Sequence, residues 1–150
     1  MAGLTLLVFV ELLVFVLLLA QSHVEYVGGT VPALASGAGG SVELSDTRYL
    51  AFYSRGKQVR VPYEHINLLE YGQKVDRRLL MAVVISPMFL LAKTRKHFLT
   101  VGYTDERGHQ QAMVFEVPKG EIRSMLVSLE AKSGHKVEFQ DEEARKAGKG

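Results

Sequence analysis

The sequence contains no cysteine and no tryptophan. Without thiols the chain forms no disulfide, no thiolate metal site and no cysteine nucleophile. Without tryptophan, any stacking on a ligand depends on Tyr and Phe side chains. A strong excess of one charge is lacking too, because 18 basic and 16 acidic residues give a formal net charge of +2. A dedicated nucleic-acid-binding protein carries a larger basic excess, so no nucleic-acid partner is expected.

Motifs that mark catalytic or cofactor sites are also missing from the sequence. The glycine-rich stretch SGAGG (36–40) lacks the GxxxxGK[ST] pattern of a phosphate-binding loop and the glycine spacing of a dinucleotide turn. No serine lies in a GxSxG elbow, and the five histidines form no HExxH pattern. We therefore expect no catalytic residue, no cofactor, no nucleotide and no metal, and hence no enzyme. The rival hypothesis is a small envelope enzyme or metal-binding protein that uses His65 or His97.

The amino-terminal segment is strongly apolar. From Leu4 to Ala20 only Thr5 and Glu11 interrupt the run, and Ala20-Gln21-Ser22 places small residues where signal peptidase reads them. Residues 1–22 are therefore predicted to be a signal peptide. An uncleaved membrane anchor, a transmembrane helix, is the alternative, since about 17–20 apolar residues can span a bilayer. Either prediction places the protein in the cell envelope or periplasm, and a cytosolic location is a third alternative.

Seven segments of the remaining chain show the alternation and the β-branched or aromatic content typical of strands. The last two, joined by DERGH, predict a hairpin in which Gly108 takes a left-handed conformation. The seven segments are Val24–Val31, Ser41–Ser45, Tyr49–Ser54, Gln58–Tyr63, His65–Gly72, Lys96–Thr104 and Gln111–Val117.

The spacing changes to that of a helix over Lys119–Gly134. An apolar stripe at i, i+3, i+4 and i+7 predicts one amphipathic helix that ends at Gly134. A short strand at Lys136–Phe139 is expected next, and residues 140–150 are predicted to be a charged, disordered tail. The stripe consists of Ile122, Met125, Leu126 and Leu129.

The stretch RYLAFYSRGKQVRVPYEHINLLEYG (48–72) resembles the middle of pleckstrin-homology-like and GRAM-type domains. The strand count and the following helix predict an α+β, mainly β fold: a small antiparallel seven-stranded barrel with a C-terminal amphipathic helix, over residues 23–139. The resemblance implies a non-catalytic module of a bacterial envelope protein that binds lipid headgroups, peptides or proteins. Phosphoinositide-binding members carry basic residues in their first loop, whereas PALASGAGG (32–40) has none, which disfavours that ligand.

One segment, RRLLMAVVISPMFLLAKTRK (77–96), places an uncharged run between basic residues. Its 14 uncharged residues reach about 21 Å as a helix, short of a hydrocarbon core of roughly 30 Å, and Ser86-Pro87 interrupts them. The segment is therefore predicted to be an apolar helix, Leu79–Leu91, inserted within one domain. A solvated collar is one interpretation of its basic ends, and contact with a partner protein or an anionic membrane surface is the other. The predicted contact residues are Arg77, Arg78, Met88, Phe89, Lys93, Arg95 and Lys96.

Overall fold

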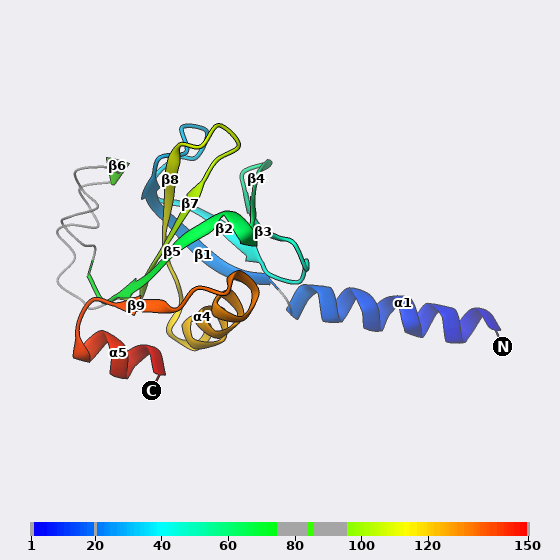
Figure 1. Ribbon diagram of the computed structural model, residues 1–150. Helices are drawn as coiled ribbons and strands as arrows, with labels where there is room; N and C mark the ends of the chain where they lie inside the picture. Colours follow the sequence, from blue (N-terminus) through cyan, green and yellow to red (C-terminus); the bar gives the residue numbers. More distant parts are fainter. Residues whose placement is uncertain (1, 20, 75–83, 86–95, 150) are drawn as a thin grey trace.

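The computed structural model describes residues 2–19, 21–74, 84–85 and 96–149, which form an α+β, mainly β fold (Figure 1). One mixed sheet has the strand order β4-β3-β2-β1-β8-β7-β5-β9, and β6 pairs with β1 off this path. A short 3₁₀ turn, Tyr63–His65, joins β4 to β5. The strands are β1 (Gln21–Gly29), β2 (Ala38–Glu43), β3 (Tyr49–Ser54), β4 (Lys57–Pro62), β5 (Ile66–Gly72), β6 (Val84–Ile85), β7 (Phe98–Thr104), β8 (Gln110–Glu116) and β9 (Val137–Phe139).

All seven predicted strand segments are strands, with ends that shift by a few residues. The seven-stranded antiparallel barrel is not confirmed. The sheet includes β6 and β9 as well, and its described strands run from one edge at β4 to another at β9 without closing. The pairing of β9 with β5 is parallel. A parallel neighbour requires a crossover connection, and the helix before β9 belongs to that connection.

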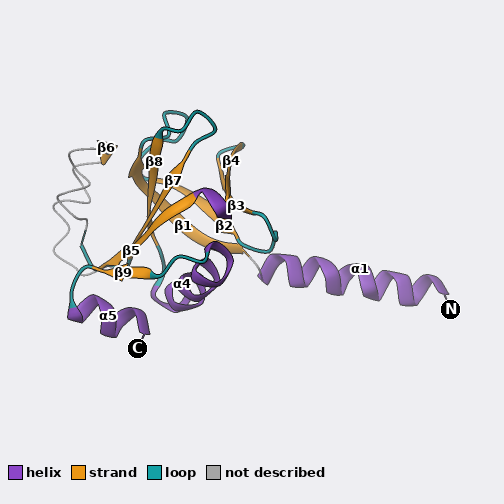
Figure 2. Ribbon diagram, viewed as in Figure 1, coloured by secondary structure: helices purple, strands orange, loops and turns teal. Residues whose placement is uncertain are grey.

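The core lies between the inner face of the sheet and the helix α4 (Lys119–Ser133) (Figure 2). Rings from three strands meet there: Phe115 lies with its centroid 5.0 Å from Phe52 and 6.1 Å from Tyr26. The four residues of the predicted apolar stripe in α4 are all buried against this cluster. Gly134 follows with φ 75°, so the predicted helix end is confirmed.

The carboxyl-terminal residues contradict the prediction of a disordered tail. Residues Glu142–Lys149 form helix α5, which lies beside α4 (Figure 1). The Asp141 carboxylate accepts a hydrogen bond from the Ala144 N–H at 2.7 Å, which satisfies a free donor of the first turn. Ala144 is fully buried, and a Cβ added to Gly148 would lie 2.7 Å from the Phe139 ring. These two small residues lie between charged residues in the sequence, and they let α5 pack closely against the domain.

The chain leaves the sheet at the end of β5 and re-enters it at the start of β7. The two strands pair up to Gly72 opposite Phe98, and the Lys96 N–H donates to the Gln73 carbonyl at 3.4 Å. Within the intervening segment, Val84 and Ile85 form β6 against Gly29 and Gly28 of β1. A continuous helix over Leu79–Leu91 is therefore wrong at these two residues. The pairs of β1 with β2 end at Tyr26, so the next residues of β1 are left for β6 to pair with. The rest of that range lies outside the described residues.

The first helix, α1 (Ala2–Leu19), projects away from the sheet domain (Figure 1). β1 begins two residues later at Gln21, so the helix leads directly into the sheet. Large apolar side chains from Leu4 to Leu13 are 53–74% exposed. Among the described residues, no helix has both the length and the hydropathy needed to cross a membrane.

Candidate functional site

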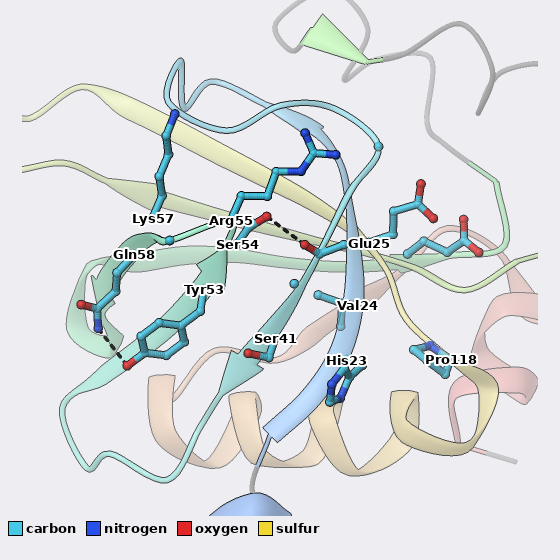
Figure 3. A pocket seen from close by; sticks show the side chains of 15 residues that line it. His23, Val24, Glu25, Ser41, Tyr53, Ser54, Arg55, Lys57, Gln58 and Pro118 are labelled. Atoms are coloured by element: carbon cyan, nitrogen blue, oxygen red, sulfur yellow. Dashed lines mark hydrogen bonds between the residues drawn. The ribbon is translucent and has the colours of Figure 1, made fainter.

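A broad open groove lies on the outer face of the sheet, over β1, β2 and the β3–β4 hairpin (Figure 3). Its volume is about 1180 Å³. Strand register builds the first row of its surface, since His23 faces Ser41, Ser41 faces Tyr53 and Tyr53 faces Gln58. Successive residues of a strand alternate between faces, so the buried neighbours Val24, Val42 and Phe52 point into the core. The groove therefore has a polar surface on the outer face of the sheet, and the apolar core lies on the opposite face.

A second row carries charge of both signs. Glu116 of β8 lies opposite Glu25 of β1, and Glu25 lies opposite Gly39 of β2. The Glu116 carboxylate forms an ion pair with the Lys96 ammonium at 2.9 Å. In the described part of the chain, Glu25 has no such ion pair, and neither has Arg55 at the far end of the row.

Gly39 leaves the floor of the groove open. A Cβ built on this residue meets no atom within 4 Å. The glycine therefore leaves free space in the groove, and no close neighbour requires it. Its neighbour Gly40 differs, because a Cβ there would meet the Tyr53 carbonyl and the buried ring of Phe52. The two adjacent glycines therefore have separate roles, one in the groove and one in strand packing.

Side-chain hydrogen bonds hold the walls of the groove in place. The Lys57 ammonium donates to the Ala33 carbonyl at 2.7 Å and ties the β3–β4 hairpin to the loop before β2. The Ser54 hydroxyl donates to the Gly39 carbonyl at 2.8 Å. On the hairpin itself, the Gln58 amide donates to the Tyr53 hydroxyl oxygen at 2.9 Å. Several polar groups are thus ordered before any ligand arrives.

The turn of the β3–β4 hairpin places Arg55 above the groove. Arg55 has φ 49° and Gly56 φ 74°, the two positive values of a type I′ turn. Among the described residues other than glycine, only Arg55 has a positive φ. A left-handed conformation costs a residue with a Cβ roughly 1–2 kcal/mol, and asparagine, aspartate or glycine is the usual occupant. The Arg55 side chain extends toward β1, which carries Glu25 (Figure 3).

Most of the contact residues predicted from the sequence lie outside the described residues: Arg77, Arg78, Met88, Phe89, Lys93 and Arg95. Lys96 is described, and its ion pair with Glu116 places it beside the acidic end of the groove. Sequence reasoning did not select His23, Glu25, Gly39 or Arg55. The arginine directly before glycine in SRGK was the one local signal, since a two-residue turn there requires positive φ at arginine.

The two histidines of the rival hypothesis lie far apart. His65 precedes β5, whose residue Ile66 faces Tyr103, whereas His97 precedes β7 at the opposite end of the same strand pair. They therefore cannot bind one metal ion together. Within the described ranges, no three His, Asp or Glu side chains come together as a metal site.

His97 is tied to the core through Tyr71. The Tyr71 hydroxyl lies 2.5 Å from Nδ1 of His97, and burial raises the pKa of Tyr71, so the phenol stays protonated. Burial, and then the positive charge of Lys119, lowers the pKa of His97. A neutral imidazole with its proton on Nε2 accepts the Tyr71 hydrogen bond, whereas a protonated ring has no acceptor.

Acidification is expected to destabilise the protein through His97. Because the folded-state pKa of His97 is lowered, the unfolded chain binds the proton first as pH falls through about 6.5. The loss of stability begins there and levels off below the folded-state pKa. The urea midpoint should fall less between pH 7.5 and pH 5.0 in His97→Gln than in the parent protein. His135→Gln, at an exposed position, is the control, and equal acid losses in the parent and His97→Gln would contradict the assignment.

Comparison with protein-family models finds no match to this chain, and comparison with curated proteins finds no significant relative.

Proposed function

We propose that this chain is a non-catalytic binding module of the cell envelope that associates with a membrane surface. The observation that carries the proposal is the apolar helix α1, whose described side chains are exposed although the sheet domain has a closed core of its own. Each large apolar side chain gains roughly 1.5–3 kcal/mol when it leaves water. The exposed set is Leu4, Leu6, Leu7, Val8, Phe9, Val10, Leu12 and Leu13.

The pattern of α1 distinguishes a membrane from a partner helix on water. Consecutive residues from Leu6 to Val10 are all apolar and exposed, so apolar side chains surround the helix. Glu11 is the single charged residue of α1. A helix that lies on a protein surface keeps a polar face toward water, whereas one that is apolar all round is buried in an apolar phase. This difference favours lipid.

The same helix supports export to the envelope. The predicted cleavage after Ser22 would fall inside β1, between the pairs Ser22 with Val42 and His23 with Ser41. Cleavage would remove two residue pairs between β1 and β2 and leave the rest of β1 in place. Without cleavage, α1 would hold the domain beside the bilayer. The intact mass of the purified protein decides between these two forms.

The pleckstrin-homology-like relationship belongs to this proposal. A series of antiparallel strands followed by a helix that packs on their open side supports it. Helix α5 and the parallel strand β9 would then be additions to such a domain. The alternative function, an enzyme or metal-binding protein using His65 or His97, receives no comparable support, and metal analysis of the purified protein tests it.

Charged substitutions in α1 are expected to abolish membrane association. We expect the full chain to float with phospholipid vesicles in a density gradient. The double variant Leu6→Asp, Leu13→Asp should lose about tenfold or more in vesicle binding, because each buried carboxylate is costly in lipid. Both positions are more than 60% exposed, so the domain core is untouched.

Val127→Asp is the matched control for this experiment. Val127 is 60% exposed on α4, so the variant adds charge to an exposed apolar position outside α1. It should float like the parent protein. Failure of the parent chain to float, or equal flotation of the α1 variant, would reject the membrane proposal.

A further inference from the structure

The groove over β1, β2 and the β3–β4 hairpin carries opposite charges at its two ends. Arg55 and Lys57 lie at the hairpin end, and Glu25 and Glu116 lie at the β1–β8 end. Gly39 separates the two ends, and no atom occupies the space where its Cβ would be. Neighbouring strands lie about 4.8 Å apart, so the backbones of β1 and β3 are about 10 Å apart across this gap.

We propose that this groove binds a zwitterionic ligand that joins a phosphate to a primary ammonium. The phosphate would contact the guanidinium of Arg55, and the ammonium would contact the carboxylate of Glu25, with the linking atoms over Gly39. Phosphoethanolamine has this chemistry, whether as a free compound or as the headgroup of a phospholipid. The proposal concerns the groove alone and does not depend on what α1 does.

The anionic half of the ligand matches the hairpin end. A guanidinium presents paired N–H donors that fit two oxygens of a phosphate. The Lys57 ammonium has three donors, and its bond to the Ala33 carbonyl uses one of them. Phosphate suits this cationic end better than carboxylate does, because it offers more acceptor oxygens and more negative charge.

The cationic half matches the β1–β8 end. Glu25 and Glu116 lie directly opposite each other, an arrangement in which like charges repel. Lys96 neutralises Glu116 at 2.9 Å, which leaves the charge of Glu25 to be balanced. A ligand ammonium beside Glu25 would balance the charge of this carboxylate. It would also relieve the remaining repulsion between Glu25 and Glu116, and this relief would favour binding.

The unusual backbone of Arg55 provides a clean test. Glycine fits the left-handed conformation better than arginine does, so Arg55→Gly removes the guanidinium and relieves the strain of the turn. Gly39→Leu fills the floor of the groove without meeting an atom within 4 Å of its Cβ. Glu25→Gln removes one charge at nearly constant shape. All three variants should therefore fold, which circular dichroism and urea midpoints verify.

Calorimetric titration of the full chain in non-ionic detergent measures the binding. O-phosphoethanolamine should bind, and inorganic phosphate and ethanolamine, its two halves, should each bind about tenfold more weakly or worse. Arg55→Gly, Gly39→Leu and Glu25→Gln should each weaken phosphoethanolamine binding by about tenfold or more. Val127→Asp, at a position that does not line the groove, should bind like the parent protein.

Nanodiscs distinguish the two sources of the ligand. If the headgroup of a lipid is bound, the parent chain should prefer phosphatidylethanolamine to phosphatidylglycerol. Glu25→Gln, which loses the contact to the ammonium, should remove that preference while α1-dependent binding remains. If a free compound is bound, soluble phosphoethanolamine binds and the lipid preference is missing.

Two results would overturn the proposal. Absence of phosphoethanolamine binding in both the soluble and the nanodisc experiments is the first. The second is inorganic phosphate binding as tightly as phosphoethanolamine with no effect of Glu25→Gln, which indicates a plain anion site. Neither result bears on the flotation test of α1, so the two proposals fail independently.

Discussion

Replacing Phe115 by alanine is expected to lower the free energy of unfolding by about 3–5 kcal/mol. The ring is fully buried in β8 and contacts Phe52 and Tyr26, with centroid separations of 5.0 and 6.1 Å. Its removal leaves a cavity at the junction of three strands, where sheet hydrogen bonds limit how far the neighbours can close in. Urea unfolding followed by circular dichroism measures the loss, because the chain has no tryptophan for fluorescence.

Val127→Ala is the matched truncation at the surface. Val127 is 60% exposed, so its change in unfolding free energy should stay within about 0.5 kcal/mol. A small effect at Phe115, or equal effects at the two positions, would show that the three rings do not form the centre of the core.

Alanine at Gly40 is expected to lower the free energy of unfolding by about 1–3 kcal/mol. The added Cβ would meet the Tyr53 carbonyl oxygen and would lie 2.7 Å from two atoms of the Phe52 ring. The Tyr53 backbone belongs to β3, which is paired on both sides, and the Phe52 ring is fully buried, so neither neighbour has room to move. Thermal and urea unfolding of the variant measure the effect.

The adjacent Gly39 supplies the control for this prediction. Its Cβ would meet no atom within 4 Å, and its φ is not positive, so Gly39→Ala should unfold within about 0.5 kcal/mol of the parent protein. Equal losses at the two glycines would mean that the face of β2 that carries the groove is assigned wrongly.

Strands and turns with strong local signals were predictable. Tyr49–Ser54 is predicted and observed with the same ends, since its run of β-prone residues stops at a two-residue turn. The left-handed Gly108 and Gly134 also appear as expected, with φ 81° and 75°. In each case neighbouring residues alone set the backbone conformation.

Elements that depend on distant partners were not predictable in the same way. β6 is two residues long and exists through its pairs with Gly28 and Gly29, more than fifty positions earlier in the chain. Helix α5 looked like a charged tail, because only Ala144 and Gly148 reveal how closely it packs. The parallel direction of β9 depends on where the end of α4 lies relative to β5. Local sequence does not encode that position.

The groove shows the same division. Glu25 and Glu116 are separated by most of the chain and become neighbours through the pairing of β1 with β8. The basic cluster predicted as a contact surface was conspicuous because its residues are close in sequence. Lys96, its described member, forms an ion pair with Glu116 beside the groove, and this pairing is not visible in the sequence.

The sequence by itself determined the mainly β class, the strand segments, the amphipathic helix and the apolar amino terminus. Each of these follows from side-chain periodicity or from the transfer of apolar groups out of water, and both are local properties. Tertiary structure alone decided the open mixed sheet, the packing of α5 and the meeting of Arg55, Gly39 and Glu25 in one groove. Register between strands places those residues together, and register is a property of pairs of segments rather than of either one.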